Sequence, residues 1–543
     1  MSVAFGLLLT GSTPTLGAGG HAGPITADAI RHHVEVLGSD AMEGRAPGTP
    51  GGERAAEYLV GQLRAAGLRP LGDRGGYRQR VPLHGTTPLP ASRFWVSNLG
   101  EERTLALGRD YVLATAGSQT LIPRPVPMVF VGYGIVAPEF DYNDYADIDV
   151  RGKTVVFLAG EPDSNDPGFF GGAAPTVYSR LETKQTIALT RGAVGSLLIP
   201  PIGPALDADW QRTRRAYAFE NLSLAYSLPE HLCAVIHPEV AAWLLGDALY
   251  DLQSVLAMAA SGTLRSFHLP VEMSFVGRFR MRDTVASNLV AVRPGTDPAL
   301  RNRFVVVSAH YDHLGIGPEI GGDRIYNGVV DNALGVACAV EMARELDRDR
   351  PAPRRSVAFL LTTAEEAGLL GARTFLDHPP MPPSHMVAAV NVDGLAFLDD
   401  FKDLVAIGGS LSDLGARLEW AIRPLGLRVS RPPDAIWNHD AYARGDQLAF
   451  AEAGVPSVLV LEGFDWPGRS REDAIADALA WMSDRYHSPK DDLEQPIDFD
   501  AAAAHCNAIL SFVEQLASSP TEPEWHPGSP YAYERLLSLA SDR

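Results

Sequence analysis

Cysteine is scarce in this chain of 543 residues, and long apolar runs are missing. Three cysteines (Cys233, Cys338 and Cys506) are too few and too scattered for a disulfide framework or a cysteine-based zinc ribbon. No run approaches the roughly 18 apolar residues that a membrane-spanning helix needs, so we expect no integral membrane segment. Hydrophobic residues nevertheless make up 46% of the chain, which is enough for a folded core.

Positive charge is also in deficit. The chain has 46 Lys and Arg against 66 Asp and Glu, a formal net charge of −20. A nucleic acid is therefore not expected as a partner, because its phosphates would be repelled. Two enzyme motifs are missing as well. There is no HExxH of a helix-borne mononuclear zinc protease and no GxSxG of a serine hydrolase. The glycine-rich run 315–322 contains Pro318 and reads as an active-site loop rather than a phosphate loop.

The two ends of the sequence differ from the rest. An apolar stretch from Val3 to Leu9 precedes small residues at 16–20, but no basic residue comes before Arg31. Residues 1–21 are thus interpreted as an atypical export signal or as a disordered terminus. The first interpretation predicts a periplasmic or secreted protein. Residues 521–543 read as a polar, proline-rich C-terminal tail that ends in a short helix.

Strands alternate with helices over much of the chain. Continuous apolar strands such as RFVVVSAH and SVAFLLTT are separated by helical patterns at 332–347, 366–377, 411–425 and 447–453. This alternation predicts an α/β fold with a mainly parallel central sheet flanked by helices. In such sheets, sites lie at the carboxyl ends of the strands. Residues 118–280 are rich in short β-strand patterns and are expected to form an inserted domain. The catalytic domain would comprise residues 22–117 and 281–520.

Carboxylates and imidazoles stand just past these strands. They are His310, Asp331, Glu365, Glu366 and Asp393, and His487 follows late in the chain. Singly, each is most simply a surface side chain or a helix cap, but together they form an N/O ligand set suited to zinc. Five ligands can serve two ions if one carboxylate bridges them. Glu365 is then left over as a general base. Asp312, two residues after His310 on the strand, would orient that histidine from behind.

These motifs resemble a known family. SAHYDHLG, TTAEEAGLLGA, NVDG and YHSPKDD resemble the co-catalytic di-zinc aminopeptidases, a family that includes secreted bacterial leucyl aminopeptidases, aminopeptidase Y and glutamate carboxypeptidases. The segment from VFVGYGI to RGAVGSLLIP resembles a protease-associated domain. The family resemblance implies a zinc exopeptidase fold with two Zn²⁺ ions per chain. One ion would be held by His310 and Asp393, the other by Glu366 and His487, and Asp331 would bridge them.

The resemblance carries two further implications. The Asp331–Asn332 peptide bond would be cis. Asp446 matches a Ser-Asp-His segment of the family, but Gly445 and Gln447 stand where the Ser and His would be, which leaves that part of the pocket open.

We therefore expect a zinc-dependent aminopeptidase that hydrolyses the first peptide bond of peptides with a free N-terminus. Two alternatives remain. One is a di-zinc carboxypeptidase or dipeptidase on the same scaffold, which would need arginines for the substrate carboxylate; Arg444 is one candidate. The other is a non-catalytic binding module, which the complete ligand set and base disfavour. The preferred first residue, the oligomeric state and the role of the insert stay open.

Overall fold

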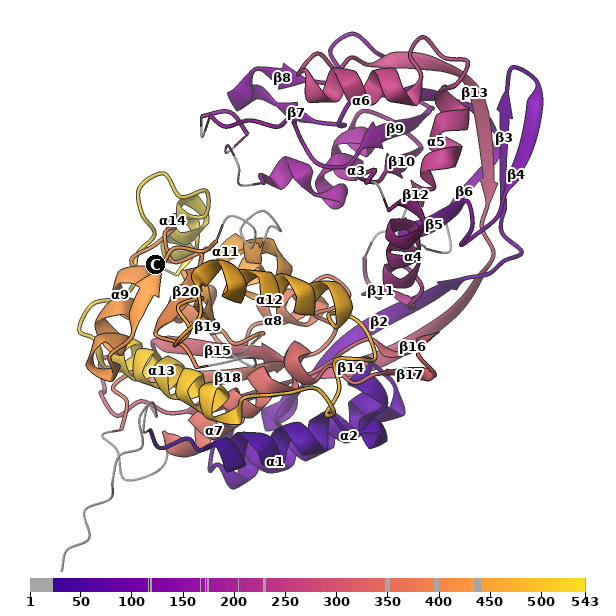
Figure 1. The fold of residues 1–543 in the computed structure, drawn as a ribbon. Coiled ribbons are helices and arrows are strands. Elements are labelled where there is room, and N and C mark those ends of the chain that lie inside the picture. The colour runs from indigo at the N-terminus through magenta and orange to yellow at the C-terminus, as the bar shows by residue number, and fades with distance from the viewer. Residues whose placement is uncertain are drawn as a thin grey trace, which may run out of the picture.

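The computed structural model describes residues 23–115, 117, 120–166, 168–170, 172, 175–203, 205–227, 231–346, 352–394, 400–433 and 441–542. The expected signal or disordered terminus at 1–21 lies outside these residues. Two sheets dominate the fold, a larger one with helices on both faces and a smaller one beside it (Figure 1).

The larger sheet has ten strands in the order β11-β2-β14-β18-β15-β19-β22-β20-β21, with β1 beside β14. Pairing is parallel among the central strands β18, β15, β19 and β22 and antiparallel at most flanking pairs. The expected α/β fold is thus confirmed, with a parallel centre in a mixed sheet. The strand bounds are β1 Arg69–Pro70, β2 Arg78–Pro88, β11 Asn221–Leu224, β14 Phe279–Arg293, β15 Phe304–His310, β18 Ser356–Thr362, β19 Met386–Asn391, β20 Asp403–Ile407, β21 Arg428–Ser430 and β22 Ser457–Glu462.

Both faces of the central strands are buried, which explains why they are apolar throughout. Along β15, Val305, Val307 and Ala309 enter the main core, whereas Val306 enters a second core on the opposite face. Successive side chains of a strand point to opposite faces, so covering both faces demands this continuous pattern.

Helices cover the two faces of this sheet (Figure 1). Thr26 caps the first helix by accepting a hydrogen bond from the Ala29 amide at 3.3 Å, and Ile30, Val34 and Leu37 form its buried stripe. The bounds are α1 Ala27–Leu37, α2 Pro50–Ala65, α7 Leu334–Glu345, α8 Leu370–Asp377, α9 Leu414–Ile422, α11 Gln447–Glu452, α12 Arg471–Asp484, α13 Phe499–Ser518 and α14 Ala532–Ser541. The short helix expected in the C-terminal tail is therefore present as α14.

The smaller sheet has eight strands in the order β4-β3-β13-β6-β9-β10-β12-β5. Their bounds are β3 Arg93–Asn98, β4 Glu101–Leu105, β5 Tyr111–Thr115, β6 Leu121–Phe130, β9 Thr154–Leu158, β10 Gly195–Ile199, β12 Leu232–Ile236 and β13 Phe267–Val276. Four helices accompany them: α3 Leu181–Thr190, α4 Leu206–Ala216, α5 Pro238–Leu245 and α6 Leu252–Ala260. This sheet begins at residue 93, ahead of the boundary that the sequence suggested at 118, because β3, β4 and β5 pair within it.

Each sheet has a core of its own. Buried residues of the main core run from Ile25 to Leu68 and then from Leu289 to Trp525. The largest core cluster of the smaller sheet runs from Phe94 to Phe275. Two short hairpins complete the strands: β7 Val136–Ala137 with β8 Tyr142–Asn143, and β16 Gly315–Ile320 with β17 Asp323–Tyr326. The second hairpin contains the glycine-rich run at 315–322.

None of the helices in the described part of the chain combines the length and the apolarity that crossing a bilayer requires.

Candidate metal centre

The predicted residues meet at one edge of the larger sheet. His310 is the last residue of β15, Glu365 and Glu366 follow β18, and Asp393 follows β19. Because these strands are parallel neighbours, with His310 in register with Thr362, their carboxyl ends deliver these side chains to one place. Asp331 comes from the turn before α7, and His487 from the segment after α12.

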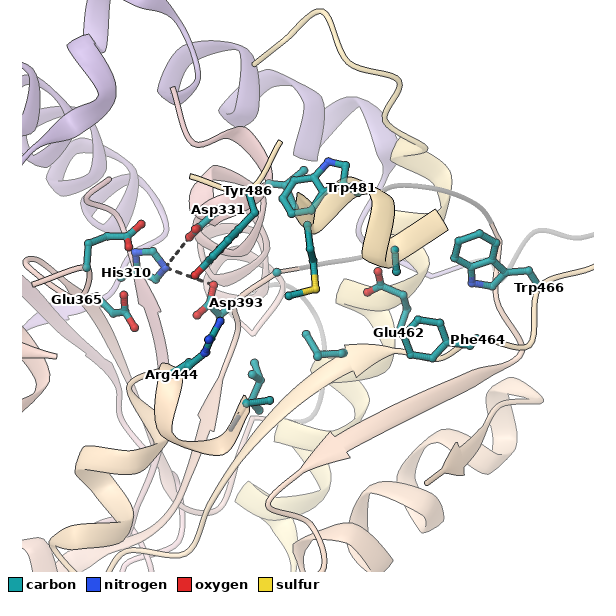
Figure 2. A pocket seen from close by; sticks show the side chains of 18 residues that line it. His310, Asp331, Glu365, Asp393, Arg444, Glu462, Phe464, Trp466, Trp481 and Tyr486 are labelled. Carbon is teal, nitrogen blue, oxygen red and sulfur yellow. Dashed lines mark hydrogen bonds and ion pairs between the residues drawn. The ribbon is translucent and has the colours of Figure 1, made fainter. Parts of the chain in front are cut away.

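Asp331 stands between two groups of side chains. Its Oδ1 lies 3.2 Å from His310 Nε2, and Asp393 Oδ1 lies 3.3 Å from the same nitrogen. Its Oδ2 lies 3.2 Å from His487 Nε2, which is itself 3.0 Å from Glu366 Oε2. Figure 2 shows His310 joined by dashed lines to both Asp331 and Asp393. One oxygen of Asp331 therefore faces each group, the arrangement that a bridging carboxylate requires.

His313 is a member of the second group that the sequence analysis missed. Its Nδ1 lies 2.6 Å from Glu366 Oε1 and 3.9 Å from Asp331 Oδ2, and its side chain is fully buried. The sequence contained one signal, the second imidazole of His310-Tyr311-Asp312-His313. Alternation along the strand singled out Asp312 instead, but β15 ends at His310 and the chain turns there.

The backbone around Asp331 is held firmly. The Asp331–Asn332 bond is cis, as expected. The Asp491 carboxylate accepts hydrogen bonds from the amides of Val330 at 2.9 Å and Asp331 at 3.1 Å. Arg45 is buried, and its guanidinium donates to the carbonyl oxygens of Tyr311 and Gly328, each at 2.7 Å. These bonds tie the turn that carries Asp331 to the end of β15.

Left-handed backbone occurs at two other places in the site, directly before Glu365 and at His487 itself. Ala364, directly before Glu365, has φ = 55°, and His487 has φ = 52°. Residues other than glycine rarely adopt this left-handed region, and they do so mainly at functional sites.

In this centre the pKa values of two carboxylates are lowered and the pKa of one histidine is raised. Burial opposes ionisation of Asp331, but the close contacts of its two oxygens with His310 and His487 outweigh burial and hold the pKa of Asp331 well below its usual value. Burial likewise opposes ionisation of Glu366, yet the nearby histidines lower its pKa to about 2. Burial opposes protonation of His487, but Glu366 and Asp331 raise its pKa to about 10. The centre is thus built to bring ionised carboxylates and histidines into close contact.

Glu365 differs from its neighbour. It is buried against the cavity, and burial, reinforced by the charges of Glu366 and Asp393, raises its pKa well above the ordinary value of a glutamate. Its amide donates to Asp312 Oδ1 at 3.2 Å. A carboxyl group whose pKa is raised in this way is suited to accept a proton.

Asp312 and Asp446 lie beneath the centre. Asp312 is fully buried, its Oδ1 lies 3.9 Å from His310 Nδ1, and burial raises its pKa to about 7. Its backbone oxygen lies closer to that nitrogen, at 3.2 Å. Asp446 accepts a hydrogen bond from the Thr362 hydroxyl at 2.6 Å, and burial raises its pKa to about 6. Gln447, in the place of the family's histidine, accepts from the Asn391 amide instead at 2.9 Å.

The donor set fits divalent metal ions. Two groups of buried or partly buried residues, His310–Asp331–Asp393 and His313–Asp331–Glu366, each have their ligand atoms within 4.8 Å of one another, and they share Asp331. Nε2 of His487 has no hydrogen-bond partner although it lies among carboxylates. Imidazole and carboxylate ligands of this kind suit zinc and related ions.

A cavity of about 210 Å³ opens beside this centre (Figure 2). His310, Asp331, Glu365 and Asp393 border one side of it, and apolar and aromatic side chains form most of the remainder. Arg444 is the only arginine among the described residues of its lining, and it also borders a second cavity next to the smaller sheet.

The cluster of His, Asp and Glu side chains at the strand ends is a candidate metal site of a peptidase-like fold. Residues 288–513 match the model of peptidase family M28. An aminopeptidase from Aneurinibacillus sp. strain AM-1 shares the fold, with a TM-score of 0.55 at 17% identity, covering 92% of this chain and 96% of that one.

Curated relatives match the chain over shorter segments. A vacuolar membrane protease of Aspergillus clavatus is 33% identical over 192 residues, which cover 35% of this chain and 16% of that protein. A vacuolar membrane protease of Pyricularia oryzae is 29% identical over 155 residues, which cover 27% and 14%. The chain thus matches less than a fifth of these relatives' length. These relatives are named vacuolar membrane proteases, which contradicts the expected periplasmic or secreted location, so that expectation is wrong.

Proposed function

We propose that the chain is a two-zinc aminopeptidase that removes the first residue from peptides with a free N-terminus. The observation that carries this proposal is the position of Asp331, whose two oxygens face two separate groups of histidine and carboxylate ligands. His310 and Asp393 would hold one ion and Glu366 and His487 the other, with Asp331 between them. Bound zinc would supply Lewis-acid polarisation of the scissile carbonyl and would make a water nucleophilic at neutral pH.

Residues of the chain itself would move the proton. Glu365 borders the cavity and its raised pKa favours protonation, so it would accept the proton of the attacking water and pass it to the leaving amine. Asp312, whose Oδ1 accepts from the Glu365 amide, would keep the backbone of this base in place. We assign Asp312 this positioning role in addition to the expected one of orienting His310.

The pocket supports cleavage from the amino end over the alternative. A carboxypeptidase binds a substrate carboxylate, for which several donors are usually needed, whereas the described lining offers Arg444 alone. The cavity is smaller than the roughly 300–1,000 Å³ of typical ligand sites, which suits a single amino-acid side chain.

The smaller sheet is proposed to be a protease-associated domain, on the resemblance of its sequence motifs. A second cavity of about 1,170 Å³ is lined by Tyr133, Glu161 and Arg180 of this part of the chain and by Ala443 and Arg444 of the peptidase domain. Because Arg444 borders both cavities, we propose that later residues of a bound peptide run along this second cavity.

Anilide hydrolysis tests the proposal directly. The purified protein, stripped with a chelator and reloaded with zinc, should hydrolyse amino-acid p-nitroanilides and leave N-acetylated ones intact. Peptides that are blocked at the N-terminus and free at the C-terminus should not be shortened. Shortening of those peptides would favour the carboxypeptidase instead, and a zinc-loaded protein without any turnover would favour a binding module.

A further inference from the structure

The cavity beside the metal centre ends at a carboxylate. Figure 2 shows Glu462 beside Phe464 and Trp466, at the opposite end of the cavity from His310 and Asp393. Besides Arg444 and Tyr486, the rest of the lining is mainly apolar and includes Leu459, Leu461, Phe464, Trp466, Trp481 and Met482. An acidic group in such surroundings has no part in the proposed hydrolysis.

The Glu462 carboxylate is only partly satisfied. Its side chain is 14% exposed, and its Oε2 is buried without a hydrogen bond. The Nδ1 of His505, on α13, lies 3.4 Å from this oxygen, outside hydrogen-bond geometry. A buried carboxylate oxygen without a hydrogen bond destabilises the folded protein, and a cationic partner at this oxygen would offset that cost.

The lining of the cavity suits a lysine or arginine side chain, because it combines apolar residues with the Glu462 carboxylate. The aliphatic stem of such a side chain would lie along the apolar wall while its charged end reaches the carboxylate. Phe464 and Trp481 also line the cavity, and aromatic rings can attract a cation by cation–π interaction, which adds to the pull of the carboxylate. The Trp466 ring already has the guanidinium of Arg469 over it, 5.4 Å from the ring centroid. An uncharged side chain such as leucine would fill only the apolar part.

Building on the proposed aminopeptidase function, we propose that Glu462 determines specificity by binding the side chain of a lysine or arginine at the first position of the peptide. The substrate class is then peptides with a basic N-terminal residue. Glu462 is placed to act on the substrate side chain and leaves the scissile bond to the centre at the other end of the cavity.

The experiment compares lysine with norleucine, which has the same unbranched carbon chain without the amine. For the zinc-loaded protein, kcat/KM on lysine p-nitroanilide should exceed that on norleucine p-nitroanilide by at least about tenfold, the order expected of one charged contact. In Glu462→Gln this ratio should fall to about one, through a loss on lysine and little change on norleucine. In Glu462→Asp, whose carboxylate is set back by one methylene, the preference should shift from lysine towards the longer arginine.

A matched control removes effects of stability. Glu341 forms another buried glutamate–histidine pair, with its Oε1 2.8 Å from His33 Nε2, and it does not line the cavity. Glu341→Gln should keep the lysine-to-norleucine ratio of the unchanged protein.

The outcomes separate the two proposals. Turnover of leucine and norleucine anilides without a lysine preference would overturn the specificity inference alone. An equal fall on lysine and norleucine in Glu462→Gln would also overturn it, because the pair with His505 would then be structural only. Absence of turnover on every anilide would overturn the aminopeptidase function and this inference with it.

Discussion

Glu365 and Glu366 are adjacent in the chain but have different surroundings. Glu366 contacts His313 and His487, and its pKa is about 2, whereas the pKa of Glu365 is raised by its burial. We expect Glu365→Gln to keep its metal and to lose at least about 10²-fold in kcat with little change in KM, because only the proton acceptor is removed. Steady-state kinetics and metal analysis of the same sample measure both effects. Near-normal turnover in a fully loaded Glu365→Gln protein would exclude Glu365 as the base.

His313 should tune metal binding through Glu366. Its Nδ1 holds the Glu366 oxygen that faces away from His487, so its removal would free the orientation of that carboxylate. We expect His313→Ala to weaken zinc binding by about 10–100-fold, the usual effect of losing a partner behind a ligand. His313→Asn, whose amide can donate near the position of Nδ1, should recover part of this loss.

Zinc titration against a competing chelator measures this effect, and Asp331→Ala provides the upper limit because it should disturb both ions. Unchanged zinc affinity in a folded His313→Ala protein would show that His313 has no part in the centre.

At the scale of elements, the sequence predicted the strands better than the boundaries between them. The apolar runs of β15, β18 and β19 are unambiguous because both of their faces are buried, and the polar residues that follow them define the centre. The start of the smaller sheet was misplaced because β3, β4 and β5 alternate apolar with polar residues, and only their partners show which sheet they join. His313 was missed because the turn after β15 decides where this strand ends. The alternation of residues along the strand does not reveal that turn.

Helix α3 carries a buried lysine whose charge should affect stability. Burial lowers the pKa of Lys184 to about 7, despite the opposing charges of Asp144 and Glu161, and its Nζ donates to the Tyr133 carbonyl at 2.6 Å. Between this pKa and the ordinary value of 10.5, the unfolded chain binds a proton that the folded chain does not. Folding is therefore favoured as the pH rises through this window, and below about pH 7 the full cost of the buried charge is present.

We thus expect the free energy of unfolding of the unchanged protein, relative to Lys184→Met, to increase by roughly 2–3 kcal/mol between about pH 7 and pH 9. Urea unfolding at several pH values measures this difference, with the exposed Lys402→Met as a control that should show no such trend. A difference independent of pH would mean that Lys184 keeps its charge in the folded protein.

At the scale of the whole molecule, the two sheets have separate cores. The main core takes none of its buried residues from between Leu68 and Leu289, and the largest core of the smaller sheet lies wholly within that interval. We expect a protein of residues 89–278 to fold without the rest of the chain and to show a cooperative thermal transition by circular dichroism. A fragment that stays unfolded would indicate that the smaller sheet depends on contacts with the larger one.

The two strands that lead into and out of the smaller sheet are neighbours. β2 and β14 pair in register from Leu289 with Arg78 to Phe279 with Pro88, and between these ends the chain builds everything from residue 89 to residue 278. In topological terms the smaller sheet is therefore an enlarged hairpin loop, joined to the larger sheet by this two-stranded stem and by β11, which returns to pair with β2. Such a stem can accept loops of different length without altering the register of the strands behind it. A short turn between Pro88 and Phe279 would therefore shorten the chain at the cost of the edge strand β11, and a different module could be grafted at the same point.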